Sequence, residues 1–334
     1  MTPLEAIRAL PKIELHLHLE TSLRLRRRAQ AAAAGDGPAL IADPAKFTGY
    51  DRLRRMRYAM RAGRVPDALY TAANIEAITY ELLAEAAAQR IMYVEVRVGG
   101  RRGFQLLGAE RMLEAMARAR MRAAADFGVR SGVIITIVRE RGPEEAAQRV
   151  REAVWGRSCG VVGVDLAGDE ANYPPALFAR PLALARDAGL GITAHAGEFA
   201  GPSSIWTALY QLGATRIGHG IRAVEDPALL DHLRDRGVTL EICPTSNLRL
   251  GLVSSPGAHP LRRLVEHGVP VTINSDDPML LDTDLCRELA LVAQVLGDGV
   301  RAMPRLMAAA ARAAFLPEEA RRALERAVAA PASR

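Results

Sequence analysis

Short apolar runs rich in valine and isoleucine recur along this chain, and a longer segment of helical character follows most of them. Parallel strands whose two faces are both covered have this β-branched composition. Eight such units in a chain of 334 residues predict an α/β fold, a (β/α)₈ TIM barrel that forms one domain over residues 1–334. The expected strands are 13–19, 91–98, 132–138, 161–166, 191–195, 216–219, 238–243 and 269–274.

The first two expected strands are about seventy residues apart, whereas a crossover between parallel strands needs only about a dozen. We therefore predict a helical insertion over about residues 22–64. A segment after the first strand of a barrel emerges on the catalytic face, so the insertion is expected to act as a lid. Leu53, Met56 and Met60 recur there at helical spacing, and the alternative is that they only attach the insertion to the barrel. Helices over about 283–329 are expected to complete the chain.

The basic charge of the chain does not indicate a nucleic-acid partner. The net charge of +6 comes mainly from arginines scattered among acidic residues, aromatic residues make up only 4%, and the one basic stripe is Arg24–Arg28. We interpret these charges mainly as solvated surface. No apolar run approaches the roughly 18 residues of a membrane span, and three widely spaced cysteines fit a reducing cytoplasm. The oligomeric state stays open.

Polar side chains collect where the expected strands end, and in this fold those ends carry the active site. Alternation along the first strand directs His16 and His18 to the same side, close enough together to bind one metal ion. A single barrel histidine is more often structural, but several at converging strand ends need a shared partner. The other residues at strand ends are His195 after strand five, His219 after strand six, and Asp276 and Asp277 after strand eight.

We predict one metal ion per chain. A second metal would need a bridging carboxylate or modified lysine after strand four, where the chain offers Asp165 but no lysine. Imidazole with one carboxylate suits zinc best, although iron and manganese stay open. The water bound to such a metal supplies a nucleophile for hydrolysis near neutral pH. The expected ligands are His16, His18, His195 and Asp276.

A hydrolytic step also needs an acid for the substrate and a base that orients the water. Glu198 follows the expected ligand His195 by three residues and can lie at the site without binding the metal. His219 and Asp277 are expected beside the metal, from two other strands. The remaining histidines are expected on the surface: His232, His259 and His267.

Seven stretches, taken together and in order, resemble the adenosine deaminase family over nearly the whole chain. They are Lys12-Ile-Glu-Leu-His-Leu-His-Leu-Glu-Thr-Ser22, Tyr93-Val-Glu-Val-Arg97, Val161-Val-Gly-Val-Asp-Leu-Ala-Gly-Asp-Glu170, Thr193-Ala-His-Ala-Gly-Glu198, Arg216-Ile-Gly-His-Gly220, Glu241-Ile-Cys-Pro-Thr-Ser-Asn247 and Asn274-Ser-Asp-Asp-Pro278. The resemblance implies a zinc enzyme that replaces the 6-amino group of a purine by oxygen and releases ammonia.

The same resemblance implies roles for the site residues. Glu198 would protonate purine N1, and His219 and Asp277 would orient and deprotonate the attacking water. Asp277 would also lie near N7, and the backbone N–H of Gly168 would meet N3. The zinc ligands would be the four residues expected above, among which His18 also borders the substrate.

Two stretches depart from the family pattern and concern the substrate. Glu20-Thr21 stands where the family commonly has aspartate and glycine, and that aspartate is expected to contact the sugar of adenosine. Val98-Gly99-Gly100 stands where an aromatic residue, serine and proline are usual. We expect Glu20 to share the ligands' face of an extended strand and to accept a hydrogen bond from a ribose hydroxyl.

The main interpretation is a deaminase of adenosine or 2′-deoxyadenosine. Its first rival is a deaminase of free adenine or of a 5′-modified adenosine such as aminodeoxyfutalosine. A metallohydrolase that cleaves amide or phosphoester bonds is a second rival, but it would not need Glu198 as an acid for purine N1. The alternative that is not an enzyme is a metal-binding barrel without turnover. The absence of a metal ligand, of Glu198 or of Asp277 would have favoured it, but the sequence contains all of them.

Overall fold

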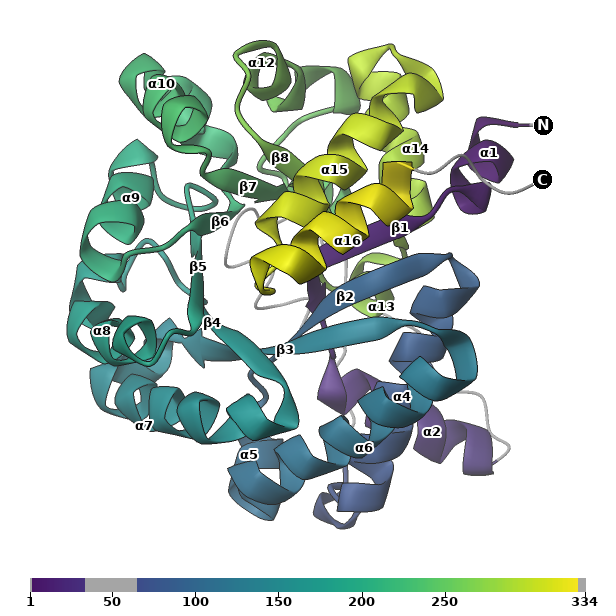
Figure 1. Ribbon diagram of the computed structural model, residues 1–334. Helices are drawn as coiled ribbons and strands as arrows, with labels where there is room; N and C mark the ends of the chain where they lie inside the picture. The colour runs from purple at the N-terminus through teal and green to yellow at the C-terminus, as the bar shows by residue number, and fades with distance from the viewer. Residues whose placement is uncertain (1, 34–64, 330–334) are drawn as a thin grey trace.

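The structure is a computed structural model that describes residues 2–33 and 65–329, and its centre is an eight-stranded parallel sheet curved into a barrel (Figure 1). The strands follow one another around the barrel in chain order, which confirms the (β/α)₈ architecture. They are β1 (Lys12–His18), β2 (Ile91–Val98), β3 (Arg130–Val138), β4 (Val161–Ala167), β5 (Gly191–Ala196), β6 (Arg216–His219), β7 (Thr239–Ile242) and β8 (Val271–Ile273).

The barrel closes between β8 and β1 partly through a side chain. The Oδ1 atom of Asn274 accepts hydrogen bonds from the backbone N–H groups of Leu15 (2.9 Å) and His16 (3.1 Å). The N–H of His18 then donates to the carbonyl of Asp276 over 2.8 Å, and the N–H of Asp276 donates to the carbonyl of His16 over 3.0 Å. This closure fixes the end of β1 against the turn that follows β8.

Helices surround the barrel, and most lie where the sequence predicts them (Figure 1). Helix α6 (Ala109–Phe127) ends at Gly128, which has the left-handed conformation of a C-terminal cap. Helix α4 (Ala72–Ala88) starts after Thr71, whose side chain accepts a hydrogen bond from the N–H of Asn74 and caps the helix. These helices are α1 (Pro3–Ala9), α4 (Ala72–Ala88), α5 (Arg101–Leu107), α6 (Ala109–Phe127), α7 (Gly142–Trp155), α8 (Ala179–Asp187), α9 (Pro202–Thr207), α10 (Pro227–Arg236), α11 (Pro244–Arg249), α12 (Leu261–Glu266) and α13 (Pro278–Leu281).

After β1 the chain enters helix α2 (Thr21–Ala33), which packs against α4. Arg24 and Arg27 both pair with Glu85, at 2.9 Å and 2.6 Å, and Arg28 pairs with Glu81. Part of the basic stripe is therefore bound to acidic residues of α4. The lid predicted for residues 22–64, with Leu53, Met56 and Met60, lies mostly outside the described residues.

The expectation that the arginines are mainly solvated is wrong for four of them. Burial of a guanidinium needs acceptors. Carboxylates and backbone carbonyls of the barrel accept from three of these arginines, and Glu85 of α4 accepts from Arg24. The four are at most 1% exposed: Arg24, Arg97, Arg139 and Arg216.

The C-terminal helices are α14 (Leu285–Leu296), α15 (Met303–Ala313) and α16 (Glu318–Ala329). Helix α15 packs on β1 and β8 and lies across one end of the barrel (Figure 1). At its last residue the carbonyl of Ala313 accepts a hydrogen bond from Arg216, and just after it the N–H of Phe315 donates to Glu95. Because Arg216 begins β6, this contact marks the covered end as the amino end of the strands.

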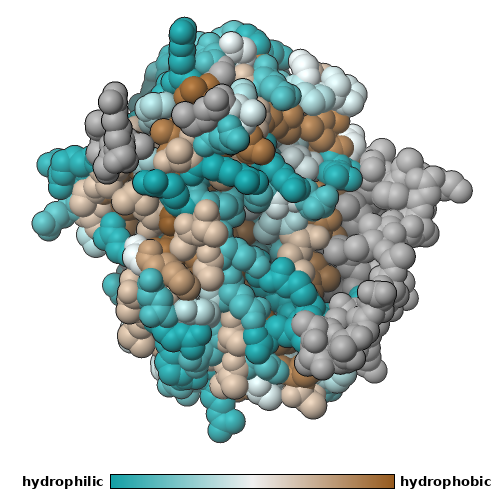
Figure 2. All heavy atoms as spheres, turned by 90° about the vertical axis from the view of Figure 1, so that its right-hand side faces the viewer, coloured by the Kyte–Doolittle hydropathy of each residue, from teal (hydrophilic) through white to brown (hydrophobic). Residues whose placement is uncertain are grey.

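Hydrophilic side chains spread over the face of the molecule seen in Figure 2, with smaller apolar areas between them. Within residues 2–33 and 65–329, no helix combines the length and the apolar character that crossing a membrane requires.

Candidate active site

Strand β1 carries two imidazoles to the carboxyl end of the barrel. His16 is completely buried, and the side chain of His18 is 12% exposed. The Nε2 atoms of both rings are buried and have no hydrogen-bond partner among the described residues. A buried polar atom without a partner costs free energy. The pair therefore indicates a ligand that the described side chains do not supply.

Buried carboxylates orient two of the site's imidazoles. The Nδ1 atom of His16 lies 3.0 Å from Glu241 Oε2, and the Nδ1 atom of His195 lies 3.0 Å from Asp165 Oδ1. Arg97 joins the two carboxylates, because its Nε donates to Asp165 over 3.3 Å and its Nη2 to Glu241 over 2.5 Å. A carboxylate at Nδ1 keeps the proton on that nitrogen, so each Nε2 lone pair faces the centre of the site.

These two carboxylates stay ionised despite their burial. Desolvation alone would raise the pKa of Glu241, but Arg97 and Arg216 outweigh it and bring the pKa below its ordinary range. Burial opposes ionisation of Asp165 in the same way, and His195 with Arg97 lowers its pKa. The arginines of the barrel interior thus have an electrostatic function in the site.

Asp276 lies beside the imidazoles because the chain turns after β8. Its φ of +62° is left-handed, a conformation that aspartate tolerates better than most residues. Its Oδ1 lies 3.5 Å from His16 Nε2 and 3.4 Å from His18 Nε2. Because β8 ends at Ile273, Asp276 and Asp277 lie in the turn and not on an extended strand.

The structure brings the predicted metal ligands together. In one group of four residues the ligand atoms all lie within 4.8 Å of one another, and His18 belongs to a second group with Asp165 and His195. The ligands that we predicted share three residues with the first group, but the fourth predicted ligand is His18, whereas the group contains His219. The first group is His16, His195, His219 and Asp276.

Glu198 follows β5 in a turn that one buried carboxylate organises. Glu170, 2% exposed, accepts hydrogen bonds from the four consecutive backbone N–H groups of residues 197–200, at 2.6–3.1 Å. Glu198 is 3% exposed, and its Oε1 lies 3.6 Å from His219 Nε2. Glu170 therefore holds the main chain that positions Glu198 beside the imidazoles.

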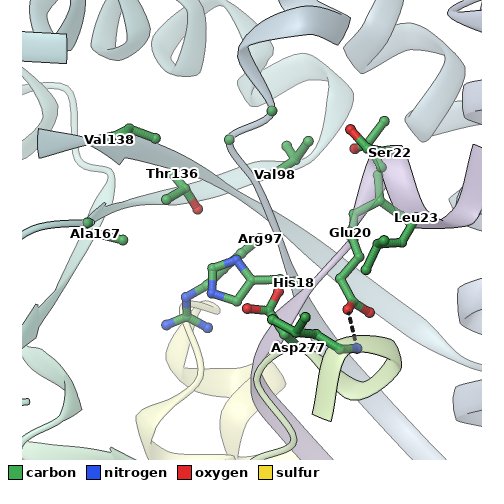
Figure 3. Close-up of a pocket in the computed structure, with 16 residues that line it drawn as sticks. His18, Glu20, Ser22, Leu23, Arg97, Val98, Thr136, Val138, Ala167 and Asp277 are labelled. Carbon is green, nitrogen blue, oxygen red and sulfur yellow. Dashed lines mark hydrogen bonds between the residues drawn. The ribbon is translucent and has the colours of Figure 1, made fainter. Parts of the chain in front are cut away.

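A pocket of about 190 Å³ opens beside His18 and Asp277 (Figure 3). Glu20 and Gly168, the other residues expected to contact substrate, also line it. The stretch that departs from the family pattern lines it as well, through Val98, Gly99 and Gly100.

Glu20 reaches the pocket by a route different from the expected one. Strand β1 ends at His18, and Glu20 has a left-handed φ of +50°, so no extended strand carries it. Its carboxylate accepts hydrogen bonds from the backbone N–H groups of Met279 (3.1 Å) and Leu280 (2.9 Å) at the start of α13, and the dashed line in Figure 3 marks one such contact. Burial and then the negative charge of Asp277 raise the pKa of Glu20 to about 8.

Residues 11–331 match the family model described as adenosine deaminase. The chain belongs to the adenosine deaminase family. An adenine deaminase of Sinorhizobium fredii is 41% identical over 243 residues, which cover 72% of this chain and 75% of that protein. An adenosine deaminase of Klebsiella pneumoniae is 38% identical over 257 residues, which cover 75% and 77% of the two chains.

One solved structure with the same fold is an amidohydrolase from Burkholderia ambifaria, described with bound Zn. It is 25% identical, with a TM-score of 0.84, and the match covers 98% of this chain and 91% of that one. The family is metal-dependent, and this deaminase has a group of histidines and an aspartate that could hold a metal. The chain is accordingly a hydrolytic deaminase.

The sequence did not single out several residues of the deaminase site. His259 was expected on the surface, but it is only 4% exposed and contacts Asn247, which contacts His219. His259 lies in the loop before α12, and the sequence around it has no pattern that distinguishes a buried histidine from an exposed one. The orienting residues Arg97 and Glu241 lie within motifs, but their contacts join different strands and no single motif reveals them.

Proposed function

We propose that this chain catalyses the zinc-dependent hydrolytic deamination of a 6-aminopurine nucleoside, adenosine or 2′-deoxyadenosine, to the inosine product and ammonia. The observation that carries the proposal is the pair of partnerless Nε2 atoms on His16 and His18, with Asp276 Oδ1 3.5 Å and 3.4 Å from them. His18 also lines the pocket, together with Asp277.

We assign one zinc ion per chain to His16, His18, His195 and Asp276. Three imidazoles and one carboxylate are a donor set that suits zinc. The carboxylates at Nδ1 of His16 and His195 support this assignment, because ligating histidines commonly have such a partner. Zinc in this place would supply a water molecule that is activated for attack on C6 of the purine.

Three side chains around the ligands would perform the proton transfers. Glu198 would donate a proton to N1, which makes C6 electrophilic, and its burial at 3% exposure supports a role inside the closed site. Asp277 would accept the proton of the attacking water, and His219 would orient that water. The proton held by Asp277 would pass to the amino nitrogen, the C6–N6 bond would break and ammonia would leave. The oxygen of water would stay on C6, and its remaining proton would return to Glu198.

The other pocket residues would bind the substrate. The backbone N–H of Gly168 would meet N3, with Asp277 near N7. Glu20, which also lines the pocket, would accept a hydrogen bond from a ribose hydroxyl.

Free adenine is the second candidate substrate. The Glu20 carboxylate already accepts two backbone hydrogen bonds from α13, which reduces its capacity for a sugar hydroxyl. The similarity to the adenine deaminase of S. fredii at 41% identity favours the same candidate.

A measurement of ammonia release from the zinc-loaded enzyme tests the proposal, with adenosine, 2′-deoxyadenosine, adenine and 5′-substituted adenosines as substrates. We expect the highest kcat/KM with the two nucleosides. Turnover of adenine with negligible turnover of adenosine would move the proposal to the second candidate, and no release from any 6-aminopurine would overturn it.

The acid is tested by Glu198→Gln, which should keep zinc and fold but lose about 100-fold or more in kcat, since the proton donor is removed. The matched control is Glu225→Gln, which changes an exposed partner of Arg222 in the same chemical way. Near-normal kcat in the Glu198 variant would remove this residue from the mechanism.

A further inference from the structure

A buried chain of hydrogen bonds leads from the start of helix α12 to His219. The backbone N–H of Leu261 lies 3.1 Å from His259 Nδ1, and His259 Nε2 lies 3.2 Å from Asn247 Oδ1. The Nδ2 atom of Asn247 lies 3.2 Å from His219 Nδ1. The three side chains are at most 4% exposed. Water therefore has little access to replace any member of the chain.

The direction of each bond follows from its first donor. A backbone N–H can only donate, so His259 Nδ1 accepts and carries no proton. A neutral imidazole has its proton on the other nitrogen, so His259 Nε2–H donates to Asn247. Burial lowers the pKa of His259 to about 4, which agrees with a neutral ring at neutral pH.

The same reasoning continues through Asn247 to His219. Because the Asn247 atom that faces His259 must accept, it is Oδ1, and the amide NH₂ faces His219. An N–H on His219 Nδ1 would then meet another donor. The Nδ1 atom of His219 therefore accepts, and the proton of this ring lies on Nε2.

We propose that Asn247 and His259 are positioning residues that hold His219 as the Nε2–H tautomer, so that His219 donates a hydrogen bond into the active site. Its Nε2 lies 3.6 Å from Glu198 Oε1 and 4.0 Å from Asp276 Oδ2, so the donated proton points among the reacting groups. A protonated Nε2 has no lone pair for a metal. His219 is consequently a donor beside the metal rather than its fourth ligand, and proton acceptance from water falls to Asp277.

The fold holds this chain of bonds rigidly. Asn247 lies on α11, and its backbone carbonyl accepts the N–H groups of Leu252 (3.0 Å) and Val253 (3.2 Å). His259 immediately precedes Pro260 and α12. The proposal rests on the proposed deamination for its catalytic consequence, but the tautomer of His219 can be measured without any substrate.

The first test is the ¹⁵N spectrum of the zinc-loaded protein with labelled histidine, in which His219→Gln identifies the His219 signals among those of the seven histidines. We expect His219 Nε2 to carry a proton and Nδ1 to have the shift of an unprotonated acceptor. A proton on Nδ1, or a His219 Nε2 coordinated to zinc, would overturn the proposal even if ammonia release proceeds as expected. The correct tautomer without deamination of any purine would instead refute the proposed function alone.

The second test compares variants of the two positioning residues. Asn247→Leu has similar volume but no donor, so His219 should lose its single tautomer and kcat should fall by about 100-fold, as for loss of one preorganised donor. Zinc content and KM should change little. An unchanged kcat and an unchanged ¹⁵N pattern would overturn the proposal.

Variants of His259 keep the test falsifiable if Asn247→Leu does not fold. The amide of His259→Gln can donate to Asn247 Oδ1, so this variant should retain the Nε2–H tautomer of His219 and most of kcat. His259→Met fills the site without a donor and should lose both. Equal effects of the two substitutions on kcat, with no change in the tautomer, would show that His259 has only a packing role.

Discussion

Replacement of Glu170 by glutamine should loosen the turn that carries Glu198. Glu170 accepts four backbone N–H groups from residues 197–200. The single oxygen of glutamine can keep at most the three bonds now made to Oε2, and its amide must then face the N–H of Gly197. Hydrogen bonds to a charged group contribute about 1.5–3 kcal/mol each and neutral ones about 0.5–1.5 kcal/mol. One lost bond and three weakened ones should lower the free energy of unfolding by about 4.5–7.5 kcal/mol.

The same substitution should affect turnover because it displaces the acid. A shift of about 1 Å in a reacting group can cost about 100-fold in rate, so kcat should fall by about that factor. Zinc content should stay near that of the wild type, since His195 precedes the turn and keeps its contact with Asp165. Urea unfolding of the zinc-loaded protein, elemental analysis and ammonia release measure the three quantities.

Glu144→Gln is the matched control, because Glu144 is exposed in the first turn of α7 and far from this turn in the sequence. Its free energy of unfolding should stay within about 0.5 kcal/mol of the wild type. If Glu170→Gln unfolds like this control and keeps a normal kcat, then the four contacts do not hold the turn and the reasoning is refuted.

Three further predictions concern the metal, the sugar and acid stability. His16→Ala should reduce zinc far below one per chain and abolish turnover, because three ligands hold the ion poorly; elemental analysis that finds full occupancy would contradict this. At about pH 9, where a pKa of about 8 leaves Glu20 ionised, Glu20→Ala should lower kcat/KM for adenosine by about one to two powers of ten and much less for adenine, as expected for a charged hydrogen bond to ribose of about 1.5–3 kcal/mol; equal losses on both substrates would assign Glu20 to the support of α13. Burial lowers the pKa of His259 to about 4, so its contribution to stability is complete above about pH 6.5 and is lost as the pH falls toward the folded-state value. Urea unfolding across this range should show a weaker loss in His259→Gln, and an identical pH dependence would exclude His259 as its source.

The architecture was accessible from the sequence because short apolar strands and amphipathic helices have local signatures. The expected strand at 216–219 coincides with β6. The exact residues at which strands end were harder to predict from the sequence. The expected strand eight continues to residue 274, whereas β8 ends at Ile273 and a left-handed Asp276 follows.

The residues of the candidate site could be predicted from the sequence, but the contacts that orient them could not. His16, His18, His195, His219 and Asp276 were found from their places at strand ends, because parallel strands of a barrel must deliver those ends to one face. The contacts that orient them could not be read from any one stretch. Glu241 lies 225 residues from His16, and Arg97 lies 68 residues from Asp165, so only the closed barrel makes them neighbours.

The sequence by itself therefore determined the barrel and the family and predicted the residues of the candidate site, since each follows from a local period or a motif. The tertiary structure decided what surrounds those residues: the carboxylates at Nδ1 of the imidazoles, the backbone N–H groups that occupy Glu20, and the burial of His259. The physical reason is that hydrogen-bond direction and desolvation depend on neighbours in space. A histidine that looks like a surface residue in the sequence becomes a buried donor only when α11 and α12 pack around it.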